Sequence, residues 1–326
     1  MKMKKSGMIL VLILVLFLVG IFLFNSNQNK TELEEVSLRL AWLHGSGFEG
    51  YYVAKEKGYY QEEGLEININ PGGLDQNSIK LVASGSDTFG LAGQVEVISA
   101  RDKGIPVKGV AAFYKNNPIV YFSKESKNII TVKDFIGKKV GVKYGLDTEI
   151  IYNALLKKEG IDREKIEETP VQFDMGLFFT DAVDVWPGFS NVEPVVAEIQ
   201  NVNINIISPL DYDIPMYAQV LVVNDKTINE KPEIIEKFIK ATKKGWLYAI
   251  EHPNEMPSLV AKYSTESNDK FERLSFQETQ KIVGDKGKIG EMNSVDWEIL
   301  TNILKEQGIV SSDFKVENSY QLGFVT

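Results

Sequence analysis

Apolar and polar positions along the chain follow two different periods. Short runs in which every second residue is apolar, such as Ser37–Trp42 and Leu65–Asn70, predict strands, because successive strand side chains point to opposite faces. Longer runs with apolar residues three or four positions apart, such as Phe48–Gln61 and Pro232–Ile250, predict helices. The two kinds of segment alternate, which predicts an α/β fold of mostly parallel strands with helices on both faces.

The same two periods define the remaining elements. The other predicted strands are Thr88–Ala92, Val107–Tyr114, Ile119–Ser123, Lys139–Tyr144, Val171–Asp174, Ala182–Val185, Asn203–Ile207 and Gln219–Val223. The other predicted helices are Gln76–Ser84, Gln94–Lys103 and Thr148–Glu159, and the chain after residue 224 is almost wholly helical.

The order of these elements predicts two lobes. Residues 36–115 and 216–326 form lobe 1, and residues 116–215 form lobe 2, which is inserted into it. The two crossing segments, Lys115–Pro118 and Asp213–Tyr217, contain Pro, Asn and Asp, which are typical of turns. Because ligands of such sheets bind beyond the carboxyl ends of the strands, we expect a site between the lobes that closes by a hinge motion.

The N-terminal 30 residues are interpreted as a signal or anchor segment. Lys2, Lys4 and Lys5 precede the apolar run Met8–Phe24, which would be about 26 Å long as a helix. No A-x-A cleavage pattern follows, which favours an uncleaved anchor over a cleaved signal. The lysines are expected on the cytoplasmic side. We therefore expect an extracytoplasmic protein, tethered through residues 8–24 only or released after cleavage.

Composition narrows the functional classes. The formal charge of −9 does not suit nucleic acid, which needs clustered Lys and Arg. The chain has no cysteine, which excludes disulfides, thiolate chemistry, cysteine-based zinc sites and a lipid-modified cysteine anchor. Its two histidines, His44 and His252, leave few ways to build a metal site or a Ser-His-Asp triad. We expect no metal, no cofactor and no catalytic residues.

Candidate binding residues gather where the predicted strands end. Aromatic residues can sandwich a flat ligand, glycines allow the backbone to approach it, and amides or a carboxylate accept hydrogen bonds from its edge. The stretch AVDVWPGFSNVEP (182–194) combines these features after a predicted strand. The predicted ligand-binding residues are Trp42, His44, Phe48, Tyr51, Gly93, Gln94, Tyr144, Asp147, Trp186, Phe189, Asn191, Glu193 and Tyr217.

Structural roles remain open for several of these residues. Trp42 and Trp186 also fit a hydrophobic core, and one of Tyr51 and Tyr52 is expected there. Glu193 also fits the first turn of a helix, where the helix dipole favours a carboxylate. His44 fits a polar loop residue as well as a ligand contact.

Four segments carry a resemblance to a known family. LRLAWLHGSGFEGYYVAKEKGYYQEEGLEI (38–67), LVASGSDTFGLAG (81–93), DFIGKKVGVKYG (134–145) and DAVDVWPGFSNVEP (181–194) resemble the thiamine-precursor and sulfonate-type solute-binding proteins. The resemblance implies a two-lobed periplasmic-binding-protein type II fold, and a monomer that delivers a small molecule to the permease and ATPase subunits of an ABC importer. It also implies that Trp42 and Trp186 (or Phe189) sandwich a ring and that Glu193 binds its amino groups.

The same resemblance brings alternatives. Related pyrimidine synthases use a pyridoxal-bearing lysine and a histidine, and the corresponding positions here are Ala92 and Glu96, so a Schiff base cannot form. The favoured ligand is a planar nitrogen heterocycle, such as an aminopyrimidine thiamine precursor or a flavin-like compound, and the acidic, aromatic rim fits an amino-bearing ring better than an anion. A binder of sulfonates, taurine or nitrate, a synthase-like enzyme and a sensory module are the other hypotheses.

Overall fold

In the computed structural model, which describes residues 33–73 and 75–325, ten strands form two sheets of five. The first sheet has the order β2-β1-β3-β10-β4 and the second β7-β6-β8-β5-β9. The strands are β1 (Glu34–Arg39), β2 (Leu65–Asn70), β3 (Phe89–Ala92), β4 (Val107–Tyr114), β5 (Ile119–Lys124), β6 (Lys139–Val142), β7 (Glu167–Pro170), β8 (Val185–Phe189), β9 (Ile204–Ile207) and β10 (Ala218–Asn224).

Each sheet is mixed rather than mostly parallel. β1 is parallel to β3, and β6 is parallel to β7 and β8. β10 is antiparallel to β3 and β4, and β5 is antiparallel to β8 and β9. The chain reaches β5 and β10 directly from the other sheet, without the crossover helix that a parallel neighbour requires. The α/β class is confirmed, and the expectation of mostly parallel sheets is corrected.

Helices flank both sheets. They are α2 (Glu49–Glu56), α3 (Tyr59–Glu62), α4 (Ser78–Ser84), α5 (Gln94–Asp102), α6 (Asp147–Lys158), α7 (Gly176–Phe179), α8 (Glu193–Ile199), α9 (Asp225–Glu230), α10 (Pro232–Glu251), α11 (Met256–Val260), α12 (Asp269–Val283) and α13 (Ser294–Glu306). The helix predicted for residues 48–61 is divided into α2 and α3 at Gly58, which has φ +75°. The predicted signal or anchor lies outside the described residues.

Two predicted strands are displaced in the second sheet. The structure has β7 at Glu167–Pro170, just before the predicted strand Val171–Asp174. β8 begins at Val185, where the predicted strand ends, so the Trp-Pro-Gly-Phe motif is itself strand and pairs with β5 along its whole length. The residues before β8 form a turn in which Asp181 has φ +60°.

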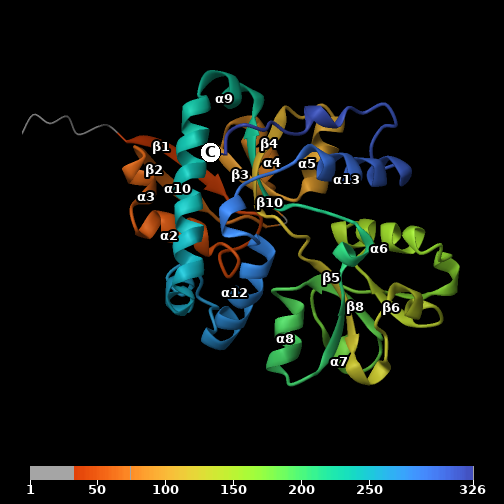
Figure 1. Ribbon diagram of the computed structural model, residues 1–326. Coiled ribbons are helices and arrows are strands. Elements are labelled where there is room, and N and C mark those ends of the chain that lie inside the picture. The colour runs from red at the N-terminus through yellow and green to blue at the C-terminus, as the bar shows by residue number, and fades with distance from the viewer. Residues whose placement is uncertain (1–32, 74, 326) are drawn as a thin grey trace, which may run out of the picture. The chain divides into compact units, whose positions relative to one another are not determined.

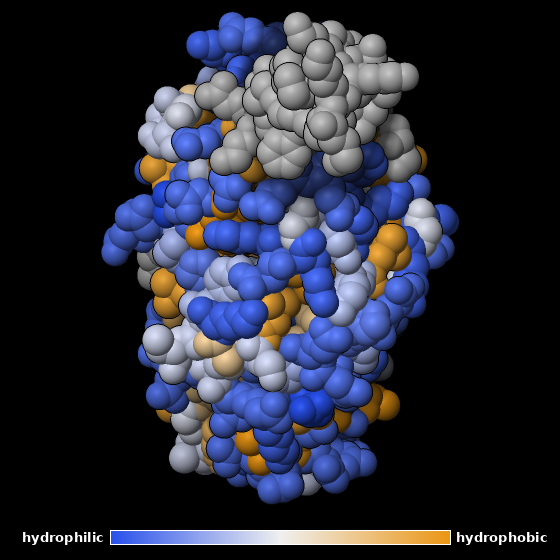
Figure 2. Space-filling model, turned by 90° about the vertical axis from the view of Figure 1, so that its left-hand side faces the viewer, coloured by the Kyte–Doolittle hydropathy of each residue, from blue (hydrophilic) through white to orange (hydrophobic). Residues whose placement is uncertain are grey.

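Apolar side chains form three clusters. One joins α2, α10 and α12 to one face of the first sheet. A second lies between the other face, α5 and α13 and continues onto the second sheet beneath α6. The third lies between the second sheet, α7 and α8. Figure 1 shows α10 and α2 on one side of the first sheet and α5 and α13 on the other. Figure 2 shows that most residues on the side facing left in Figure 1 are hydrophilic.

Two glycines let α2 and α10 pack closely. A Cβ atom on Gly245 would lie 2.1 Å from the carbonyl oxygen of Gly50, and a Cβ atom on Gly50 would lie 2.3 Å from the indole of Trp246. Both separations are far below van der Waals contact. This packing holds the start of α2, and with it the loop that follows β1.

A buried carboxyl group stands at the first position of α2. Glu49 is fully buried and accepts hydrogen bonds from the backbone N–H of Gly47 at 3.0 and 3.1 Å. Burial raises its pKa from 4.5 to about 7, opposed by these hydrogen bonds, and the nearby Glu272 carboxylate adds to the rise. Folding therefore favours the protonated form of Glu49 over much of the acidic range.

The first prediction concerns the α2–α10 contact. Gly245→Ala should lower the free energy of unfolding by about 1–3 kcal/mol, because the added methyl group meets a backbone carbonyl that cannot rotate away. Gly287→Ala is the matched control, since its Cβ would meet its nearest neighbour at 3.4 Å. Denaturant melts of both variants measure the effect, and equal stability would contradict the packing argument.

The second prediction concerns pH. Between about pH 4.5 and about pH 7 the folded protein keeps the Glu49 proton that the unfolded chain has lost, so this group's contribution to stability falls as pH rises. The stability advantage of the wild-type protein over Glu49→Gln should therefore shrink as pH rises across that range. Glu56→Gln is the control: Lys262 and Tyr263 lower the pKa of Glu56, so its contribution to stability is lost only as pH falls below about 4.5 and should stay nearly constant across this range. A flat difference between wild type and Glu49→Gln in unfolding melts would refute the assignment.

Candidate functional site

The loop after β1 presents a backbone carbonyl to side chains from two other strands. The carbonyl oxygen of Gly47 accepts hydrogen bonds from the hydroxyl of Tyr114, at the end of β4, and from Nε2 of Gln219, near the start of β10, at 3.1 and 2.6 Å. A Cβ atom on Gly47 would lie 2.7 Å from the Tyr114 hydroxyl oxygen, and its φ is +95°. Glycine is therefore required at this position.

A buried ion pair lies on the second sheet. Lys143, directly after β6, places its Nζ 2.6 Å from Oε1 of Glu193, at the start of α8, and both side chains are less than a tenth exposed. The other oxygen of Glu193 accepts a hydrogen bond from the backbone N–H of Phe189 at 2.8 Å. A Cβ atom on Gly188 would lie within 2.9 Å of three Glu193 side-chain atoms, so the carboxylate packs directly on this glycine.

Two contacts join this pair to the first sheet. The ring of Phe173 lies 5.4 Å from the Lys143 ammonium and 5.7 Å, between ring centroids, from Trp42. Asn191 donates from Nδ2 to the hydroxyls of Tyr114 at 3.3 Å and of Thr279, on α12, at 3.0 Å. We call the following residues the inter-sheet cluster: Trp42, Gly47, Tyr114, Lys143, Phe173, Asn191, Glu193, Gln219 and Thr279.

Three of the predicted binding residues belong to the inter-sheet cluster. They are Trp42, which is 44% exposed, and the buried Asn191 and Glu193. Phe189 borders it through its backbone, and its ring is about one-third exposed. Glu193 is both the first residue of α8 and the partner of Lys143, so both interpretations of its position hold.

Trp186 lies elsewhere. It is fully buried among Phe178, Val120 and other members of the third apolar cluster, and its indole N–H has no hydrogen-bond partner among the described residues. A ring enclosed on all sides has no face to offer a ligand, so the predicted stacking role is corrected to a core role. Because β8 begins later than predicted, Trp186 is its second residue rather than the residue after its end.

Three more of the predicted aromatic residues and one amide have structural roles. Tyr51 is fully buried against Phe113 and Trp246, and Phe48 is buried beside Tyr52. The backbone N–H of Tyr217 donates to Oε1 of Gln94 at 2.8 Å, and its hydroxyl donates to Asp296 at 2.6 Å. The hydrogen bonds of Gln94 and Tyr217 thus fix the position of the segment that enters β10 of the first sheet.

The remaining predicted residues lie around the cluster without joining it. The Tyr144 hydroxyl donates to Glu168 at 2.7 Å. His44 contacts the Tyr52 hydroxyl at 3.1 Å, and its pKa is lowered by partial burial and by Lys55.

Gly93, directly after β3 of the first sheet, and Asp147, at the start of α6, lie next to each other. A Cβ atom on Gly93 would lie 2.9 Å from an Asp147 oxygen and 3.5 Å from a Glu96 oxygen. Desolvation and the Glu96 carboxylate raise the pKa of Asp147 to about 7.

Six members of the cluster were not predicted, and one of them, Gly47, takes part through its backbone. Lys143 and Tyr114 stand at strand ends, so the rule that selected Trp42 could have selected them too. Phe173 lies in a segment that was predicted to be a strand. Gln219 and Thr279 have no local sequence signal, since their places depend on contacts with residues 172 and 88 positions away, respectively.

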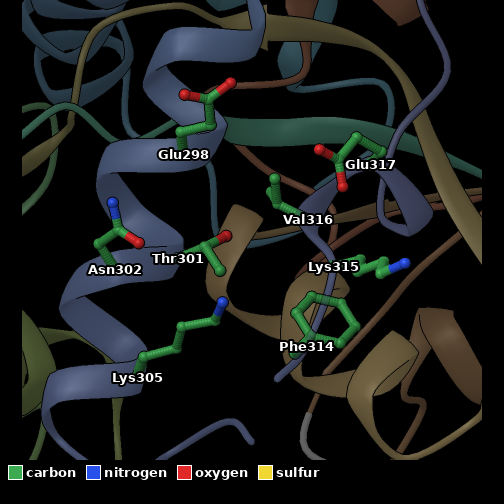
Figure 3. Close-up of a pocket in the computed structure, with 8 residues that line it drawn as sticks. All are labelled: Glu298, Thr301, Asn302, Lys305, Phe314, Lys315, Val316 and Glu317. Carbon is green, nitrogen blue, oxygen red and sulfur yellow. The ribbon is translucent and has the colours of Figure 1, made fainter. Parts of the chain in front are cut away.

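Two pockets lie outside the cluster. One, of about 460 Å³, is lined by α8, β9 and α12 and includes Ser190 and Pro194, which flank the Asn191–Glu193 segment. The other, of about 260 Å³, lies between α13 and the C-terminal segment that carries Phe314 and Val316 (Figure 3). Neither is lined by a predicted binding residue. Within residues 33–73 and 75–325, no helix combines the length and apolar character that crossing a bilayer requires.

Comparison with known proteins gives relatives along most of the chain. A formylaminopyrimidine-binding protein of Halalkalibacterium halodurans is 28% identical, with 86% of this chain and 89% of that protein covered. The riboflavin-binding protein RibY of Chloroflexus aurantiacus is 26% identical, with 90% and 86% covered. More distant relatives are named 4-amino-5-hydroxymethyl-2-methylpyrimidine phosphate synthase.

Solved structures share the fold. The periplasmic aliphatic sulphonate binding protein SsuA of Escherichia coli superposes with a TM-score of 0.68 at 15% identity, over 87% of this chain and 91% of that one. The chain therefore has the periplasmic-binding-protein fold that the sequence resemblance implied. The model of the family described as NMT1/THI5 like matches residues 46–256, and the chain belongs to this family.

Proposed function

We propose that this chain is an extracytoplasmic solute-binding protein of an ABC importer that binds a small, planar, amino-bearing nitrogen heterocycle at the inter-sheet cluster. The observation that carries the proposal is the pairing of an exposed aromatic face with buried polar groups. Trp42 and Phe173 supply flat surfaces from opposite sheets, and Glu193 and Asn191 lie on the segment next to them. Two relatives are named for a formylaminopyrimidine and for riboflavin, which are both planar nitrogen heterocycles.

The charge of the cluster supports a neutral or weakly cationic ligand. Its ammonium group, on Lys143, is already neutralised by Glu193 at 2.6 Å. An anion such as a sulfonate would have to compete with that carboxylate for the lysine. The sulfonate-binding neighbour shares the fold at 15% identity, which is no guide to the ligand.

A synthase activity is the second hypothesis, since some relatives carry that name. Schiff-base chemistry with pyridoxal needs a lysine amine at the site. The position that corresponds to that lysine is Ala92, which is buried, and Lys143 is engaged in an ion pair. These features favour binding and release over catalysis.

The proposed location rests on the N-terminal segment. Its basic start and apolar run would export residues after 30 and hold them at the membrane surface, or release them after cleavage. In either case the protein would collect its ligand outside the cytoplasm and deliver it to a permease.

The third prediction tests the stacking face. Trp42 is the exposed tryptophan, and Trp186, Trp246 and Trp297 are fully buried, so a stacked ring should quench mainly Trp42 fluorescence. Trp42→Ala should weaken binding of 4-amino-2-methylpyrimidine by about 1–3 kcal/mol, the usual effect of losing one stacking face. Calorimetric titration of the purified protein measures this affinity.

Two further variants separate stacking from stability. Trp42→Phe should keep most of the affinity but lose the fluorescence response. Trp186→Phe should lower thermal stability while leaving affinity unchanged, because Trp186 is a core residue. The proposed ligand class is wrong if riboflavin or an alkanesulfonate gives saturable binding and the aminopyrimidine does not.

A further inference from the structure

The Gly47 carbonyl fixes which way the Gln219 amide faces. A carbonyl oxygen can only accept, so the Gln219 atom 2.6 Å from it must be the nitrogen. The side-chain oxygen, Oε1, then points elsewhere. It is buried, and no hydrogen-bond partner for it lies among the described residues.

The same logic orients Asn191. The Tyr114 hydroxyl donates its one proton to the Gly47 carbonyl, so towards Asn191 it can only accept. The Asn191 atom facing Tyr114 is therefore also the nitrogen, and its second proton goes to Thr279. Oδ1 of Asn191 is left buried, again without a partner in the described part of the chain.

These two amides approach one glycine from opposite sheets. A Cβ atom on Gly47 would lie 3.7 Å from the side-chain nitrogens of both Asn191 and Gln219. Asn191 is 4% exposed and Gln219 is 7% exposed. Gln219 is also held at φ +47°, which is unusual for a residue other than glycine and occurs directly after the second crossing segment.

Burying an amide oxygen without a partner is unfavourable by about 1–3 kcal/mol. The bonds from Gln219 and Tyr114 to Gly47 lie within lobe 1, so they are kept whether or not lobe 2 is in contact. The bonds of Asn191 to Tyr114 and Thr279 form only when the lobes meet, and the same contact brings Asn191 beside Gln219 at Gly47. Contact between the lobes is therefore opposed by the free energy of burying unpartnered amide oxygens, and a ligand that donates hydrogen bonds to them removes this opposition.

We infer that Oε1 of Gln219 and Oδ1 of Asn191 are acceptors for the exocyclic amino group of the ligand, and that they oppose closure of the lobes until such a group is bound. This inference rests on the proposed function and adds to it a chemical criterion. Two N–H donors on the ligand match two acceptors from opposite lobes, so a ring without an amino group leaves both unsatisfied.

The affinity test compares two ligands that differ in one group. Wild-type protein should bind 4-amino-2-methylpyrimidine at least about thirtyfold more tightly than 2,4-dimethylpyrimidine, in which a methyl group replaces the amino group. Gln219→Met, which removes Oε1 at similar size, should reduce this preference about tenfold. Gln61→Met, the same change on exposed α3, should leave it unchanged. Asn191→Leu, on the other lobe, is a second variant in case Gln219→Met does not fold.

The closure test needs no ligand. The chain has no cysteine, so Lys133→Cys on lobe 2 and Lys226→Cys on lobe 1, at side chains that are 71% and 78% exposed, allow specific labelling with a fluorophore pair. Without ligand, Gln219→Met should shift the dye–dye distance towards the closed form relative to wild type, because one unfavourable burial is gone. The Gln61→Met control should not shift it.

The outcomes separate the two proposals. A reduced preference together with a shorter ligand-free distance supports the inference. An unchanged preference, or a ligand-free distance equal to that of wild type, overturns it. If wild type binds neither pyrimidine, the proposed function fails, and the ligand-free distances still decide whether the amide oxygens oppose closure.

Discussion

The carbonyl oxygen of Gly47 is the point on which the polar contacts between the two sheets depend. It receives one hydrogen bond from β4 and one from β10, and through the Tyr114 hydroxyl it orients the amide that arrives from the second sheet. The positive φ of Gly47, and the absence of a side chain there, allow three groups to converge on one residue. Close packing of α2 on α10 in turn holds this loop in place. A small set of backbone constraints thus determines where the side chains that could recognise a ligand lie.

Much of the fold could be predicted from the sequence because the spacing of apolar residues within a short segment is enough to distinguish a strand from a helix. β2 and β4 have the predicted bounds, and four of the five helices for which bounds were predicted begin and end within two residues of the observed positions. The errors arose where tertiary pairing decided the outcome. The stretch around Trp186 alternates well enough to be a strand at either of two positions, and pairing with β5 selects the later one. That selection moved Trp186 from a predicted strand end into the core, and it kept Asn191 and Glu193 beyond the strand.

The candidate site was predictable only in part for the same reason. Trp42, Asn191 and Glu193 follow strands, and this local rule identified them. Lys143 is a buried cation whose role depends on a carboxylate 50 residues later, and Gln219 acts on a carbonyl 172 residues earlier. No pattern within either segment encodes such a partner. The residues that the sequence did not reveal are those that join one sheet to the other, and the inferred selectivity depends on them.

The central place of β10 has a consequence for how the chain folds. β10 lies between β3 and β4, yet it follows β4 by more than a hundred residues, and the whole second sheet is made in between. The first sheet is therefore incomplete until β10 has been synthesised, because β3 and β4 each pair with β10 and not with each other. Long-range pairing of this kind slows folding, because a large loop must close before the contacts that stabilise it can form. The inter-sheet cluster, which includes Gln219 of β10, can therefore form only after the strands of both sheets are available.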